Sequence, residues 1–158
     1  MIVVTVGTQL PFDRLISAMD RLAPTLSEPV FAQIGHGSYV PVNLEWTREL
    51  PPAAFEAKLA AATVLVAHAG TGSMMAAQRF GKPLILFPRR AALGEHRNDH
   101  QWHMCAALGG KTGVHIAADE ADLAALLAKP LQAADVAADA RERSRFTGRL
   151  RDALKAWS

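Results

Sequence analysis

The sequence predicts an α/β protein in which helices flank a Rossmann-like, doubly wound parallel sheet of five or six strands. The first observation is that short apolar runs of strand length alternate with segments of helical periodicity. This alternation is typical of βαβ units with right-handed crossovers. The second is that glycine-rich turns follow two of the runs, at Gly7 and Gly70, and each turn leads into a helical segment. The third is the length of 158 residues, which fits one domain over residues 1–158.

Local signals delimit each predicted element. The β-branched run 2–6 reads as a buried strand, and a helix begins near residue 12 or 13, with apolar residues at helical spacing as far as Leu26. Pro51 and Pro52 start a helix over 53–62, and a Gly-Lys-Pro stop follows the helix over 72–80. Asp119 is the expected N-cap of a helix over 119–127. The other expected elements are strands at 30–34, 42–46, 63–67, 84–87 and 114–117 and a helix at 98–108.

The C-terminal segment, about residues 135–157, is predicted to be a further helix with one apolar stripe. Phe146, Leu150, Leu154 and Trp157 fall at steps of three and four along it. The stripe fits packing against the domain's own sheet, or in part against another protein. The sequence leaves both open.

Composition limits the classes of function. The net charge of +2 and the single tyrosine do not suggest a nucleic-acid binder, because the basic residues are scattered. The mild excess of positive charge suits anionic small molecules or an acidic membrane surface. No apolar run is long enough to span a bilayer, and no signal peptide is expected, so we predict a cytoplasmic protein. The single cysteine, Cys105, excludes an internal disulfide and is expected to be a buried thiol.

The turn over residues 69–73, Ala-Gly-Thr-Gly-Ser, has the composition of a phosphate cradle. Glycine lets a ligand approach the main chain closely. The helix that follows points unpaired N–H groups and partial positive charge at the same place. Thr71 and Ser73 add hydroxyl groups, although Ser73 would also serve as a simple helix cap.

A charged, histidine-rich loop over residues 88–101 follows the next predicted strand. In open parallel sheets, ligands bind at the carboxyl ends of the strands, where this loop lies. Side chains that bond sugar hydroxyls are common in it, so together with the cradle it suggests a nucleotide-sugar site. Its candidate ligand-binding residues are Arg89, Arg90, Glu95, His96, Asp99, His100 and Gln101.

Other site types fit less well. The G-x-G at Gly70 has Met75 where a dinucleotide-binding motif needs its third glycine, and no P-loop or Asp-x-Asp motif occurs. A serine–histidine acyl-transfer site lacks its G-x-S-x-G motif. His96, His100 and His103 at steps of four and three leave a zinc site as a weaker alternative.

Three segments carry a family resemblance: G-T-Q-L-P-F-D-R-L, A-H-A-G-T-G-S and P-R-R-A-A-L-G-E-H-R-N-D-H-Q. Over roughly residues 1–127 the chain resembles the glycosyltransferase family 28 C-terminal domain. Within it, the likeness is to stand-alone bacterial exopolysaccharide glycosyltransferase subunits. The chain is also similar to the small catalytic subunit of the eukaryotic dolichol-linked N-acetylglucosaminyltransferase.

The resemblance implies the donor-binding half of a GT-B enzyme. Such a hexosyltransferase subunit takes a UDP-sugar and transfers the sugar, with inversion, to a lipid-linked acceptor without a metal or other cofactor. A membrane-anchored partner subunit would supply the acceptor half and hold the chain at the inner face of the membrane. A homodimer of the isolated chain stays open, as do glucuronic acid, glucose, galactose and N-acetylglucosamine as the sugar. The alternative is a non-catalytic nucleotide-binding or regulatory module of a polysaccharide assembly.

The resemblance also assigns roles to residues. Many relatives carry a ribose-binding glutamate where this chain has Ala76, and Glu95 is the candidate replacement. His68 stands in the cradle as a packed residue, a phosphate contact or, less readily, a catalytic group, and Arg89 or Arg90 would stabilise the leaving UDP. His100 and Gln101 stand where relatives read the sugar. The residues expected to hold or face the diphosphate are Gly7, Thr8, Gly70, Thr71, Gly72 and Ser73.

Overall fold

The computed structural model describes residues 1–108 and 110–133, so the predicted C-terminal helix over 135–157 lies outside the described residues. Within them the chain forms one six-stranded sheet in which every pair of neighbouring strands is parallel. In chain order the strands are β1 (Ile2–Thr5), β2 (Val30–Gln33), β3 (Glu45–Thr47), β4 (Val64–Ala67), β5 (Leu84–Leu86) and β6 (Val114–Ile116).

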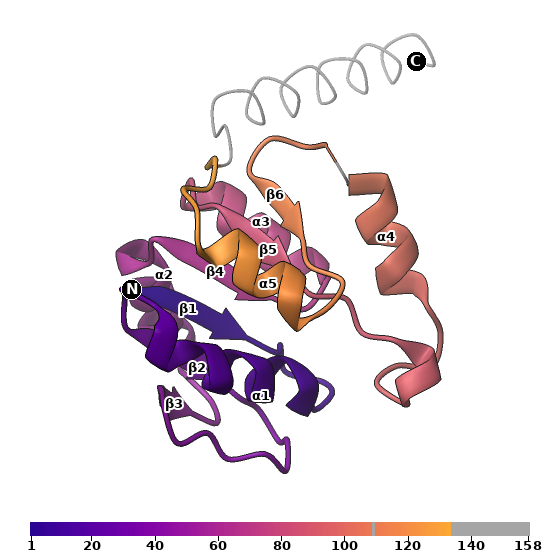
Figure 1. The fold of residues 1–158 in the computed structure, drawn as a ribbon, viewed down its shortest axis with the longest axis horizontal. Helices are drawn as coiled ribbons and strands as arrows, with labels where there is room; N and C mark the ends of the chain where they lie inside the picture. The colour runs from indigo at the N-terminus through magenta and orange to yellow at the C-terminus, as the bar shows by residue number, and fades with distance from the viewer. Residues whose placement is uncertain (109, 134–158) are drawn as a thin grey trace, which may run out of the picture.

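The strand order β3-β2-β1-β4-β5-β6 places β1 and β4 at the centre of the sheet (Figure 1). From β1 the chain winds outward to β2 and β3. It then returns to β4, next to β1, and winds outward in the opposite direction through β5 and β6. The winding direction therefore reverses between β1 and β4. In doubly wound sheets such a reversal opens a crevice at the carboxyl ends of the two strands.

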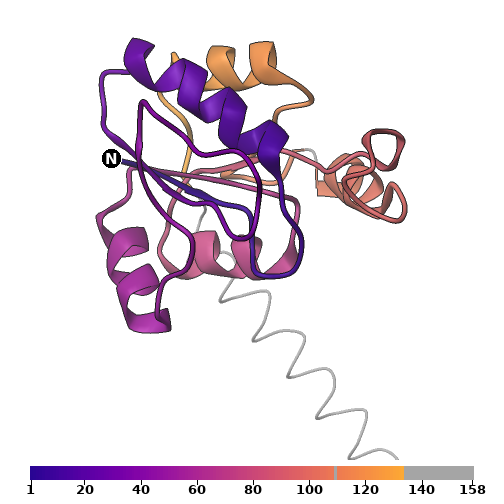
Figure 2. The same ribbon diagram turned by 90° about the horizontal axis from the view of Figure 1, so that it is seen from below.

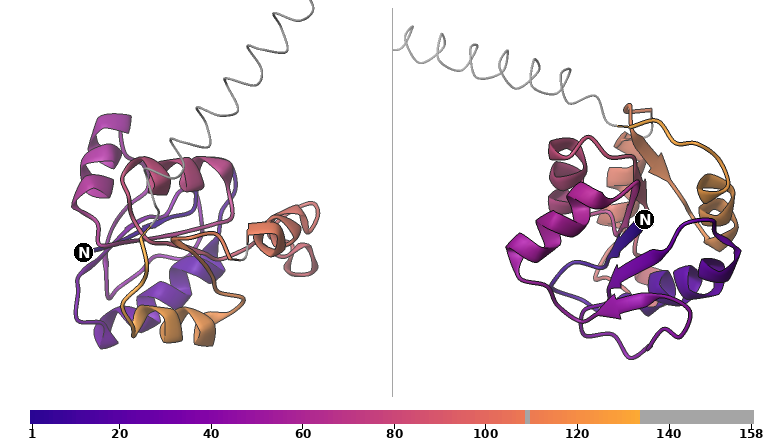
Figure 3. Two further views of the ribbon diagram at one scale, coloured as in Figure 1. Left: turned by 90° about the horizontal axis from the view of Figure 1, so that it is seen from above. Right: turned by 90° about the vertical axis from the view of Figure 1, so that its left-hand side faces the viewer.

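Five α-helices lie within the described ranges: α1 (Asp13–Leu22), α2 (Pro52–Ala61), α3 (Thr71–Arg79), α4 (His100–Leu108) and α5 (Glu120–Leu127). Helices α1 and α5 cover one face of the sheet, and α2 and α3 cover the other, as Figures 2 and 3 show from opposite sides. Helix α4 projects to the side of these layers. Two short 3₁₀ turns, Ala23–Thr25 and Ala91–Leu93, complete the regular structure.

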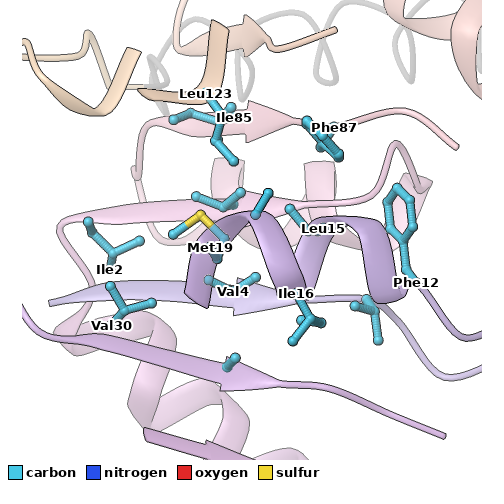
Figure 4. Packing of buried hydrophobic residues seen from close by; sticks show 14 of the residues in the cluster. Ile2, Val4, Phe12, Leu15, Ile16, Met19, Val30, Ile85, Phe87 and Leu123 are labelled. Atoms are coloured by element: carbon cyan, nitrogen blue, oxygen red, sulfur yellow. The ribbon is translucent and has the colours of Figure 1, made fainter. Parts of the chain in front are cut away.

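The core has two halves, one on each face of the sheet. Successive residues of a strand point to opposite faces; Val3 of β1 accordingly packs in one half and Val4 in the other. The larger half includes Leu15 and Met19 of α1 and Leu123 of α5 (Figure 4). The central strands are buried on both faces, as their continuous apolar sequences indicate.

The predicted fold class is confirmed, and most boundaries agree to within one or two residues. Asp119 caps α5 as expected, because its side chain accepts a hydrogen bond of 2.9 Å from the N–H of Asp122. Cys105 is buried as expected, and burial raises the pKa of its thiol to about 11. Leu26 is not part of α1, since the 3₁₀ turn follows that helix directly.

The predicted strand 42–46 is wrong in position, because β3 begins only at Glu45. The carboxylate of Asp20, buried in α1, accepts hydrogen bonds from the N–H groups of Val42 and Asn43 and from the hydroxyl of Tyr39. These two amides are consequently engaged with a helix side chain, and the loop before β3 is fixed against α1.

Candidate functional site

A cavity of about 710 Å³ opens at the carboxyl ends of β1 and β4, where the winding direction reverses. Most of its polar lining comes from the turn after β1, the turn after β4, and the β5–α4 loop with the first turn of α4. A partly apolar wall comes from the connection between β3 and α2 and from the start of α2. The site residues predicted from the sequence that line it are Gly7, Thr8, His68, Gly70, Thr71, Gly72, Ser73, Arg89, His96, His100 and Gln101.

The turn after β1 needs glycine at its first position. Gly7 has a φ of +76°, a conformation that residues with a side chain rarely adopt. Its N–H donates to the hydroxyl of Thr5 at 3.2 Å, and that hydroxyl donates to Gln33 Oε1 at 3.1 Å. A buried polar chain thus connects the turn to the end of the neighbouring strand β2.

The turn after β4 delivers the N-terminus of α3 to the cavity. Gly70 is the N-cap of this helix, and no side chain caps it, so the alternative that Ser73 serves only as a cap is wrong. Ser73 is buried and lines the cavity instead. Among the described residues, the N–H groups of Thr71, Gly72 and Ser73 have no hydrogen-bond partner. The helix start therefore presents three free donors and its positive dipole end at the cavity.

The imidazole ring of His68 fills the space between the two turns. A Cβ atom on Gly7 would lie 2.6 Å from its Cε1, and a Cβ on Gly70 would overlap its Nε2. The ring therefore packs against main chain that only glycine makes available. Burial, helped by the nearby charge of Arg89, lowers the pKa of His68 to about 4. The imidazole is consequently neutral near pH 7 and is a poor general base there.

A hydrogen bond between Arg89 and Gln101 joins the β5–α4 loop to α4. Gln101 is buried in the first turn of α4, and its Oε1 accepts the main-chain N–H of Arg89 at 3.1 Å. The same hydrogen bond fixes the orientation of the amide and leaves its NH₂ group as a donor. His96 and His100 line the cavity with more exposed rings.

Arg90, Glu95 and Asp99 are not among the residues that line the cavity, and their expected contact with a ligand stays a prediction. Arg90 donates to the carbonyl of Ala118 at 2.7 Å and its guanidinium lies 5.4 Å from the ring of Trp102. The carboxylate of Glu95 binds Arg14 at 2.6 and 2.9 Å, and Asp99 accepts the N–H of Ala91 at 2.9 Å. These side chains hold the loop in place.

No three His, Cys, Asp or Glu side chains come close enough to hold a metal ion in the part of the chain that the structure describes. His96, His100 and His103 therefore do not form the zinc site that their spacing allowed.

Sequence reasoning missed the cavity's other lining residues. Gln33 is the polar end of an otherwise apolar strand, and that change of polarity is its signal in the sequence. Leu50, Pro52 and Phe55 form the apolar wall, and only the tertiary fold brings them beside the glycine turns. Phe55 of α2 packs partly against the core and also borders the cavity.

The profile of the glycosyltransferase family 28 C-terminal domain matches residues 1–155. The chain belongs to this family. A search among curated proteins found no match.

Solved glycosyltransferases have the same fold as this family 28 domain. The glycosyltransferase of kitacinnamycin is 20% identical with a TM-score of 0.60, and the match covers 98% of this chain and 39% of that one. SsfS6 of Streptomyces sp. SF2575, in complex with thymidine diphosphate, is 22% identical with a TM-score of 0.52, covering 80% of this chain and 30% of that one. This chain thus spans well under half the length of these glycosyltransferases.

The solution structure of ALG13 is similar over nearly its whole length. It is 18% identical with a TM-score of 0.61, and the match covers 90% of this chain and 92% of that one. At such identities the likenesses establish the fold, a GT-B-type domain. Within the described residues of this family 28 domain, no helix combines the length and the apolar character needed to cross a membrane.

Proposed function

We propose that this domain is the donor-binding half of an inverting, UDP-sugar-dependent hexosyltransferase that acts in exopolysaccharide biosynthesis. It works without a metal or other cofactor, and a membrane-anchored partner subunit presents a lipid-linked acceptor at the cytoplasmic face. The observation that carries the proposal is the cavity between the two glycine turns, with the neutral ring of His68 between them. Membership of the family supports sugar transfer as the reaction.

The cavity suits a diphosphate. Free N–H groups of α3 and the positive end of its dipole face it, and the hydroxyls of Thr71 and Ser73 stand beside them. Aspartate and glutamate are missing from its lining among the described residues, so no carboxylate repels the phosphates. The ionisable side chains that do line it are Arg89 and three histidines.

The two ends of the cavity suit the two ends of a UDP-sugar. Leu50, Pro52 and Phe55 come from the β3–α2 side and offer an apolar surface for the uracil base. His100 and Gln101 come from the β5–α4 side and offer hydrogen bonds to the sugar hydroxyls. Because β3 and β5 lie on opposite sides of the central pair, the diphosphate falls between them.

The proposed reaction is a single displacement. An acceptor hydroxyl forms a bond to the anomeric carbon from the face opposite UDP, while the bond between that carbon and the phosphate oxygen breaks. The electron pair of the broken bond stays on UDP, where N–H groups and the helix dipole stabilise the growing charge. The proton of the acceptor goes to a base, and the low pKa of His68 favours a base on the partner subunit.

Two assays on the full chain test the proposal. Calorimetry should show that UDP binds far more tightly than uridine, because the cavity is built around the diphosphate. Radiolabelled sugar should move to lipid only when membranes that contain the partner subunit are added. Transfer by the chain alone would refute the split enzyme. Tight UDP binding without transfer in the complete assembly would instead favour the regulatory module.

A further inference from the structure

Arg89 is a buried cation that forms no ion pair with a carboxylate among residues 1–108 and 110–133. Its side chain is 2% exposed, and none of the ion pairs among the described residues includes it. Burial lowers its pKa to about 10, which still leaves it charged at pH 7. Burying a cation is costly unless hydrogen bonds compensate for the lost water. The contacts of Arg89 therefore indicate which part of the structure requires it.

Those contacts are main-chain carbonyls of the turn after β1. One terminal nitrogen donates to Val6 at 3.0 Å and to Leu10 at 2.8 Å, and the other donates to Pro11. Val6 precedes the turn, and Leu10 and Pro11 end it. A single guanidinium thus fastens both ends of the turn, and the ring of Phe12, 4.4 Å away, lies against it.

The middle of the turn is left free. Thr8, Gln9 and Leu10 line the cavity, and among the described residues their N–H groups have no hydrogen-bond partner. Successive unpaired amides beside a cavity form an anion-binding nest. Because its two ends are fixed on Arg89, the turn keeps these donors available before any ligand arrives.

Other parts of the site hold Arg89 itself. Gln101 of α4 accepts its main-chain N–H, so the segment proposed to contact the sugar also sets the position of the guanidinium. The three carbonyls accept from two nitrogens that lie in one plane. Only the planar fork of arginine provides that geometry, since lysine carries its charge on a single atom.

We propose that Arg89 is a positioning residue: by fastening Val6, Leu10 and Pro11, it shapes the turn after β1 into the second half of the diphosphate site, opposite α3. The inference rests on the proposed function, since it presumes that the cavity takes a nucleoside diphosphate. It differs from a direct contact, in which the charge of Arg89 would pair with the phosphate.

Substitution of Arg89 by Lys and by Met tests the inference, with Arg90→Met as the matched control outside the cavity. The readout is the ratio of UDP affinity to uridine affinity, which cancels losses common to both ligands. We expect the ratio to fall about tenfold or more in both Arg89 variants, the size of one charge-assisted hydrogen bond. It should stay unchanged in Arg90→Met. If Arg89→Lys keeps the wild-type ratio of UDP affinity to uridine affinity, a positive charge at this position suffices and the inference fails. Equal losses of affinity for UDP and uridine would show that Arg89 has a merely structural role.

Amide NMR of the wild-type chain keeps the test decisive even if the Arg89 variants fail to fold. The N–H signals of Thr8, Gln9 and Leu10 should move downfield with UDP and stay in place with uridine. If UDP binds and these signals do not move, the inference fails while the proposed function stands. If wild-type protein does not prefer UDP over uridine, the proposed function itself fails.

Discussion

The imidazole ring of His68 occupies the space that a Cβ atom on Gly70 would need. By contrast, a Cβ on Gly72, two residues further into α3, would meet no atom within 4 Å among the described residues beyond its own stretch of helix. The two glycines of one turn therefore serve different purposes. Gly70 makes room for a side chain of the protein, whereas Gly72 leaves space on the cavity side.

Gly70→Ala and Gly72→Val should consequently give opposite phenotypes. Gly70→Ala forces the ring of His68 to move and should lower the free energy of unfolding by about 1–3 kcal/mol, as overpacking does. Gly72→Val should fold normally but lose most of its UDP affinity, because its side chain fills the proposed phosphate position. Thermal unfolding and calorimetry with UDP measure the two effects. A folded Gly72→Val protein with normal UDP affinity would place the phosphates elsewhere.

His68 should make the protein sensitive to acid. Its pKa of about 4 in the folded protein lies below the ordinary 6.5, so the unfolded chain takes up the proton first. The stabilisation is complete above pH 6.5 and declines as the pH falls toward 4, by up to about 3 kcal/mol. Urea unfolding of the wild type and of His68→Gln across this range measures it. An equal pH dependence in the two proteins would contradict the assignment.

Glu95 should prove structural. Its carboxylate is 12% exposed and holds Arg14 of α1 with two hydrogen bonds, so Glu95→Gln should cost about 1–3 kcal/mol of stability. UDP affinity should change little, because Glu95 does not line the cavity. A double-mutant cycle with Arg14→Gln measures the interaction energy between the two side chains. A loss of UDP affinity in Glu95→Gln but not in Arg14→Gln would contradict the structural role and support the predicted contact between Glu95 and the ribose.

Two variants of Gln101 separate its hydrogen bonds. Gln101→Glu keeps an acceptor for the N–H of Arg89 but removes the NH₂ donor, whereas Gln101→Met removes both. We expect Gln101→Glu to retain its melting temperature, to lose some UDP affinity because it brings a carboxylate into the cavity, and to lose more affinity for the complete UDP-sugar. Gln101→Met should lose all three. Competition assays with UDP and a panel of UDP-sugars measure these affinities. Equal losses of affinity for UDP and UDP-sugar in Gln101→Glu would show that Gln101 does not contact the sugar.

The parts of the site that follow from local sequence were predictable. Gly70 and Ser73 stand in a short pattern whose spacing by itself indicates a turn and a helix start. The role of Arg89 was not predictable, because an arginine after a strand looks the same whether it faces a ligand or three carbonyls about 80 residues away. The place of Glu95 likewise depends on Arg14, a partner far away in the chain.

The fold, too, could be predicted where local sequence determines it and not where distant contacts do. Alternating apolar runs and helical segments determined the class, but the start of β3 depended on buried Asp20, which engages the amides of Val42 and Asn43. Sequence periodicity carries no information about such a contact.

The pairing of β1 with β4 has a consequence for how the chain folds. Residues 2–47 and 64–116 each form a unit of three parallel strands, and Ile2 pairs with Val64 across the line where the units meet. That pairing closes a loop of about 60 residues and is entropically the most expensive in the sheet. Because residues of both units line the cavity, a ligand bound there would contact both and hold them together. Hydrogen exchange should therefore slow in both units together when UDP binds. A chain cut between residues 62 and 63, after α2 and the cavity wall, would give a split protein designed to reassemble on UDP.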